Sequence, residues 1–134
     1  MRKYGTIPCT LWDDPTIKQF GLPTYMVALY LRSNKHSNMV HLYALSPLYA
    51  SADLCIPAEE YLECLDNLVS IGYCRYSPDH NVIWVRSAML FDIGAKMAKN
   101  DKRIKGLNKL LPMLPNCPLK EEFVQEFSKH YGIK

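Results

Sequence analysis

Two helical segments separated by a very short connection constrain the fold of this chain most. The first begins at Pro47 and reads PLYASADLC, and the second begins at Pro57 and reads PAEEYLECLDNLVSIGY. Proline is tolerated in the first turn of a helix, so both prolines predict helix starts. Because only Cys55 and Ile56 connect the two helices, the helices must cross steeply. The sequence therefore predicts a helix-turn-helix.

The neighbouring segments predict a small sheet around these two helices. Upstream, a largely apolar helix after Pro23 leads into a short strand at residues 38–45 (NMVHLYAL). Downstream of Gly72, YCRY and VIWVRSA (residues 82–88) flank the turn SPDHN, which predicts a β-hairpin with a five-residue loop. The order helix, strand, helix, helix, hairpin is that of a winged helix.

Two further helical segments follow the hairpin. Residues 92–114 form a basic segment that Pro112 and Pro115 stop, and Pro118 opens a last helix with one apolar stripe, formed by Leu119, Phe123, Phe127 and Tyr131. We expect an α+β, mostly α fold: a winged helix-turn-helix core over residues 1–93, with residues 94–134 packed on the same domain as the basic segment and closing helix.

Composition and motifs exclude several classes of protein. No apolar run reaches the roughly 20 residues of a membrane span, and residues 1–10 lack a signal-peptide core, so we expect a cytoplasmic protein without a membrane partner. The 5 cysteines form no CxxC pair and are expected to be reduced. No HExxH, Gly-rich phosphate loop or GxSxG motif occurs. We therefore predict no catalytic residues, metal or cofactor, and a protein that is not an enzyme.

The charges are distributed unevenly. The helix that starts at Pro57 occupies the position of a DNA-reading helix, yet it carries four acids and no base: Glu59, Glu60, Glu63 and Asp66. At about 6 Å and an effective dielectric near 20, each such acid would repel a phosphate by roughly 3 kcal/mol before screening. The acids either complement the helix dipole on a solvated face or form a protein-interaction surface around Glu59, Glu60 and Glu63.

The candidate DNA-binding residues lie elsewhere, on the hairpin and the basic segment. Residues 96–109 hold six basic side chains against Asp101 alone, a local net charge of +5. Lysine and arginine in such a run can track phosphates without sequence preference, and arginine near a wing can enter a minor groove. Ordinary surface residues are the alternative interpretation. The predicted set is Arg75, His80, Asn81, Arg86, Lys99, Lys102, Arg103 and Lys105.

Nearly the whole chain resembles one family. The segments YGTIPCTLWDDPTIKQF, SNMVHLYALSPLYASADLCIPAEEYLECLDNLVSIGYCRY, VIWV and IKGLNKLLPMLPNCPLKEEF look like the amino-terminal winged-helix domain of phage replication initiators, or replisome organisers, and related DnaD-like primosome components. In that family a further region often follows this domain. Since the sequence ends soon after the domain, we expect any loader-binding part to be absent from it, or the chain to be a fragment or a single-domain relative.

The resemblance implies a role in starting phage or prophage DNA replication. Its implied partners are double-stranded origin DNA and a helicase or helicase loader. A second copy of the chain is a further candidate partner, with its basic segment meeting the acidic helix. Two alternatives share the predicted fold: a winged-helix transcriptional regulator, and a winged-helix module used only for protein association.

Overall fold

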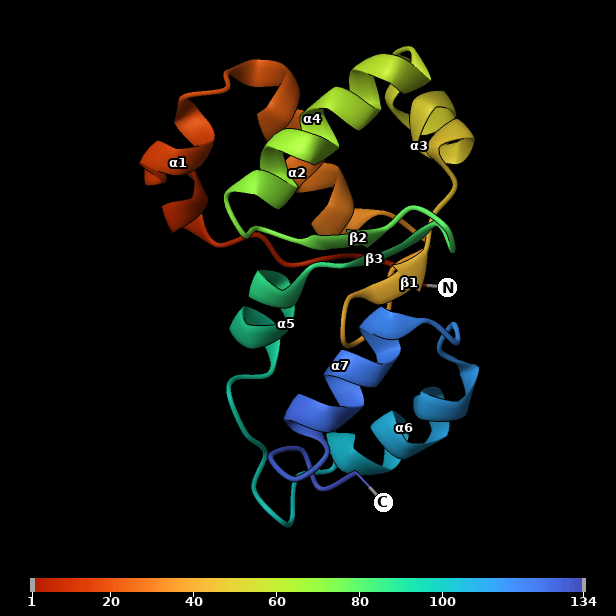
Figure 1. Ribbon diagram of the computed structural model, residues 1–134. Coiled ribbons are helices and arrows are strands. Elements are labelled where there is room, and N and C mark those ends of the chain that lie inside the picture. The colour runs from red at the N-terminus through yellow and green to blue at the C-terminus, as the bar shows by residue number, and fades with distance from the viewer. Residues whose placement is uncertain (1, 134) are drawn as a thin grey trace.

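The computed structural model describes residues 2–133 and shows an α+β chain that is mostly helical (Figure 1). Residue 1 of the predicted region 1–93 and residue 134 of the predicted region 94–134 lie outside the described residues. In chain order the elements are η1 (Cys9–Asp13), α1 (Pro15–Lys18), α2 (Leu22–Ser33), β1 (Leu42–Ala44), α3 (Pro47–Leu54), α4 (Ala58–Ser70), β2 (Arg75–Ser77), β3 (Val82–Trp84), α5 (Arg86–Asp92), α6 (Arg103–Leu110), η2 (Leu111–Met113) and α7 (Pro118–Phe127).

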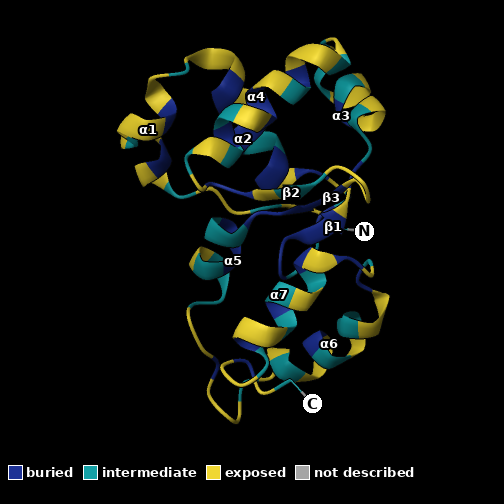
Figure 2. Cartoon of the chain, viewed as in Figure 1, coloured by how far each residue is buried: buried dark blue, intermediate teal, exposed yellow. Residues whose placement is uncertain are grey.

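A three-stranded antiparallel sheet lies at the centre of the molecule. The strand order is β1-β3-β2, so the last strand of the chain is the middle one. Trp84 pairs with Leu42 on one side and with Arg75 on the other. Because side chains alternate along a strand, Trp84 and Leu42 point to one face, while Ile83 and its partner Tyr43 point to the other. Helices cover both faces, and the middle strand β3 is buried along its whole length, dark blue in Figure 2.

One face of the sheet packs under the first helices. The side chains of Tyr61, Leu65 and Leu68 form a buried apolar stripe on α4, within the cluster that contains Ile83. The helix α4 packs against α2 and α3. The backbone of Cys55 turns into the left-handed region at φ 58° immediately after α3, which lets the chain reverse into α4 within three residues.

The opposite face of the sheet packs on α7. The apolar stripe of α7 is buried, and the rings of Phe123 and Phe127 meet the indole of Trp84 edge-on at centroid distances of 5.9 and 6.1 Å. Leu107 of α6 and Met89 of α5 complete this second cluster. The sheet therefore separates two apolar clusters, one formed mainly before the hairpin and one mainly after it (Figure 1).

Two predicted strands are shorter in the structure than the sequence indicated. The strand expected over residues 38–45 covers only Leu42–Ala44, because the Asn38 side chain accepts hydrogen bonds from the backbone of Val40 and Leu42 and His41 adopts φ 56°. The strand expected over residues 82–88 ends at Trp84. The helix α5 follows at once, and it buries Ala88 and Met89.

The basic segment is helical only in its second half. Gly94 has φ 98°, and residues 94–102 are irregular. The helix α6 begins at Arg103, whose backbone N–H donates to Asp101 Oδ1 at 2.9 Å. The first backbone N–H groups of a helix have no acceptor within it, and Asp101 supplies one for Arg103, while the N-cap residue Lys102 makes no side-chain capping bond.

A largely buried cluster of polar side chains connects four segments of the chain. Asp92, at the end of α5, lies 2.7 Å from His41 Nε2 and 3.6 Å from a guanidinium nitrogen of Arg32. Burial lowers the pKa of His41, so the neutral imidazole donates through Nε2 to Asp92 and accepts at Nδ1 from the Ser37 hydroxyl. Arg32 also donates to the Thr6 carbonyl at 3.1 Å. The cluster joins the amino-terminal segment, α2, the turn before β1 and α5.

Replacing Asp92 with Ala is expected to lower the free energy of unfolding by about 3–5 kcal/mol, because the substitution leaves the buried Arg32 without a counter-charge. The change is measured by denaturant unfolding. Asp79→Ala, on the exposed hairpin loop, serves as the control and should change stability by no more than about 0.5 kcal/mol. Equal effects of the two substitutions would contradict this account of the cluster.

Candidate nucleic-acid interface

The tip of the β2–β3 hairpin presents two of the predicted residues to solvent. A four-residue loop, 78–81, joins the strands, and His80 and Asn81 are both exposed. His80 Nδ1 lies 3.0 Å from Ser77 Oγ, and Asn81 Oδ1 accepts from the Tyr76 hydroxyl at 3.3 Å. Asn81 has φ 52°, a conformation that asparagine adopts more readily than most residues. The tip is thus shaped by local hydrogen bonds.

The two predicted arginines of the hairpin are ion-paired with α7. Arg75, the first residue of β2, donates to Glu122 Oε1 at 3.1 Å. Arg86, the first residue of α5, donates to Glu126 Oε1, and its guanidinium lies 5.5 Å from the centre of the Phe127 ring. The structure therefore places both arginines beside acids at the base of the hairpin, away from the residues of the tip.

The lysines of the basic segment are exposed. Lys99, Lys102 and Lys105 form no ion pair within residues 2–133. Arg103 differs, because its Nε and NH2 groups donate to the two carboxylate oxygens of Asp101 at 3.1 and 2.8 Å. These hydrogen bonds lower the pKa of Asp101 to about 2. The positive charge of Arg103 is consequently compensated by the carboxylate of Asp101, whereas the ammonium charges of the three lysines are not compensated by a described residue.

A hollow beside α6 brings three of the basic side chains together. It has a volume of about 700 Å³ and is lined by Lys99, Lys105 and Lys109, together with Asp101, Ile104, Asn108 and Gly132. Ammonium groups from the irregular stretch and from the helix thus border one surface depression. Such an arrangement can follow a chain of phosphates by charge alone.

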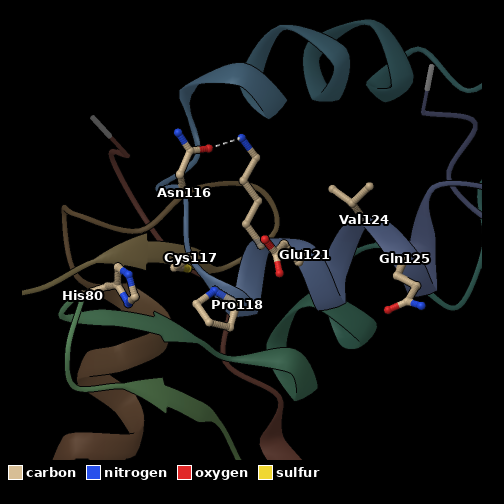
Figure 3. A pocket seen from close by; sticks show the side chains of 8 residues that line it. His80, Asn116, Cys117, Pro118, Glu121, Val124 and Gln125 are labelled. Carbon is tan, nitrogen blue, oxygen red and sulfur yellow. Dashed lines mark hydrogen bonds between the residues drawn. The ribbon is translucent and has the colours of Figure 1, made fainter.

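A second hollow lies between the hairpin tip and the start of α7 (Figure 3). Its volume is about 740 Å³, and His80 faces Cys117 and Pro118 across it. Lys120 Nζ donates to Asn116 Oδ1 at 3.2 Å on the same side. Its lining combines a histidine, a lysine and Glu121, so its charge is mixed.

The predicted protein-interaction residues lie on the outer face of α4. Glu59, Glu60 and Glu63 are exposed, and so is Asp66 one turn further on. None of the four forms an ion pair with another described residue. Glu59 and Glu60 stand in the first turn, where the helix dipole favours negative charge. The helix therefore presents an uncompensated acidic face away from its buried stripe.

No group of three His, Cys, Asp or Glu side chains within residues 2–133 is arranged to hold a metal ion. In the same range, no helix has both the length and the apolar character needed to cross a bilayer. Comparisons with protein-family models, with curated proteins and with solved structures each gave no match.

Two residues of this surface were missed by the sequence prediction. The sequence places Glu122 and Glu126 in the closing helix and does not identify them as partners of the hairpin. Their spacing of four residues places them on one side of α7, next to the apolar stripe. That spacing was the available signal, but only the packing of α7 on the sheet shows which cations they meet.

Proposed function

We propose that this chain is a winged-helix domain that binds double-stranded DNA. The element order α2, β1, α3, α4, β2, β3 and the sheet order β1-β3-β2 support the winged-helix assignment. In such a fold the tight α3–α4 pair forms the helix-turn-helix, and the β2–β3 hairpin is the wing.

The basic segment is the principal phosphate-binding surface in this proposal. The observation that carries it is the set of exposed lysines without ion pairs that surround the hollow beside α6. Lysine contacts of this kind neutralise phosphates and release counterions, so binding should depend steeply on salt and weakly on sequence. The wing tip, through His80 and Asn81, supplies a second contact at a groove.

The helix α4 contributes little to DNA contact in this proposal, although it holds the position of a recognition helix. Its four exposed carboxylates repel phosphates, and no base on its outer face compensates for them. This acidic face is better suited to a basic protein partner than to DNA, and Glu59, Glu60 and Glu63 would contact that partner. The family resemblance suggests a helicase or helicase loader as that partner and phage replication initiation as the setting.

A module used only for protein association is the second candidate function. The ion pairs of Arg75 and Arg86 favour it, since they remove two cations from the predicted DNA set. This alternative predicts a chain that binds protein partners or itself through the acidic face and does not bind a DNA duplex at low salt.

Replacing Lys99, Lys102 and Lys105 together with Ala is expected to weaken binding to a random-sequence duplex. The slope of log K against log salt should become shallower by about 2.7, since each lost phosphate contact contributes roughly 0.9. Fluorescence anisotropy at several salt concentrations measures both quantities. The control K3A/K18A/K35A removes the same charge from exposed lysines outside the basic segment.

Absence of binding by the unaltered protein at micromolar concentration and low salt would overturn the DNA proposal and favour the association module. Equal slopes for the two triple variants would contradict the assignment of the basic segment.

Replacing His80 with Ala tests the wing. The loss of one groove contact should cost about 0.5–1.5 kcal/mol of binding free energy, which is up to roughly tenfold in affinity. The salt slope should stay the same, because a contact to a base edge in the groove neutralises no phosphate. His36→Ala, on the connection between α2 and β1, is the control in the same anisotropy assay, and an equal effect of both substitutions would speak against wing contact.

A further inference from the structure

Arg75 and Arg86 are brought to one site by the sheet and held there by one helix. Arg75 is paired in register with Trp84, and Arg86 follows Trp84 by two residues. Both guanidinium groups bond to α7, to Glu122 at 3.1 Å and to Glu126 one turn later. Two cations from different elements thus meet two carboxylates on the same side of a helix.

The site has an open hollow and an unused donor. A cavity of about 240 Å³ is lined by both arginines, by Trp84, by Glu122 and Glu126, and by Gln125. Trp84 is only 1% exposed, and its buried indole Nε1 has no hydrogen-bond partner among residues 2–133. Buried donors without partners are rare in folded proteins. Together with the two guanidinium groups, the indole gives the site donors suited to oxyanions.

The arginines are also accessible without movement of α7. The side chain of Arg75 is 53% exposed and that of Arg86 is 39% exposed. Ion pairs at such exposure are weak. The ring of Phe127 under the Arg86 guanidinium would keep this group in place if its carboxylate partner were lost.

We propose that Arg75, Arg86 and the Trp84 indole form a latent phosphate site at the base of the hairpin, which Glu122 and Glu126 keep closed by occupying the arginines. The ligand class is a backbone phosphate of the duplex, so the inference rests on the proposed function. While both carboxylates are ionised, the arginines are neutralised internally, and a phosphate that approaches them releases few counterions. Removing a carboxylate charge opens the site.

The test compares Glu122→Gln with Glu121→Gln. Both remove one negative charge from adjacent positions of α7, but Glu121 is exposed and has no ion pair with a described residue. Duplex affinity is measured by anisotropy over a range of salt concentrations. The Glu122→Gln protein should show a salt slope steeper by about 0.9, the value for one added phosphate contact, and the Glu121→Gln protein should keep the original slope.

A double-mutant cycle tests whether the steeper salt slope of the Glu122→Gln protein depends on Arg75. Arg75→Ala should leave the slope of the otherwise unaltered protein unchanged and should abolish the gain in the Glu122→Gln background. Glu126→Gln provides a second variant that opens the site through Arg86. If thermal unfolding shows that the Glu122→Gln protein is not folded, the salt slope of the Glu126→Gln protein tests the latent site instead.

The outcomes separate this inference from the proposed function. If the unaltered protein binds duplex but Glu122→Gln and Glu126→Gln have the slope of Glu121→Gln, the latent site is overturned and the DNA proposal stands. If none of the proteins binds duplex, both fail. Binding that appears only in the Glu122→Gln or Glu126→Gln protein would support the latent site directly.

Discussion

The burial of strand β3 on both faces is the constraint on which the rest of this structure depends. Its Ile83 side chain packs under α2 and α4, and its Trp84 side chain packs on the rings of Phe123 and Phe127. A three-residue strand with one solvated face would offer little apolar burial, whereas each buried large apolar side chain contributes about 1.5–3 kcal/mol. The helix α7 is therefore part of the core.

That same helix determines the charge of the hairpin. The stripe that covers Trp84 turns Glu122 and Glu126 toward the edge of the sheet, where the two arginines stand. Core packing and surface electrostatics are consequently coupled through one amphipathic element. This coupling explains why the hairpin arginines are ion-paired, whereas Lys99, Lys102 and Lys105 form no ion pair with a described residue.

Local patterns in the sequence predicted α3, α4 and α7, but they missed α5 and the long-range pairings. Pro47 identified the start of α3, and Pro118 identified the start of α7. The end of β3 at Trp84 was missed because VIWVRSA has strand-like composition, while burial of Ala88 and Met89 favours a helix there. The partners of Arg75 and Arg86 depend on how α7 crosses the sheet, which no local pattern encodes.

The central claim is that duplex DNA contacts the basic segment and the hairpin tip and avoids the acidic face of α4. Backbone amide chemical shifts during titration with a short random-sequence duplex test it most directly. The account predicts that the largest changes occur at residues 78–81 and 96–109, with little change at residues 59–66. Changes centred on the first turns of α4, or no changes at a duplex excess in low salt, would contradict it.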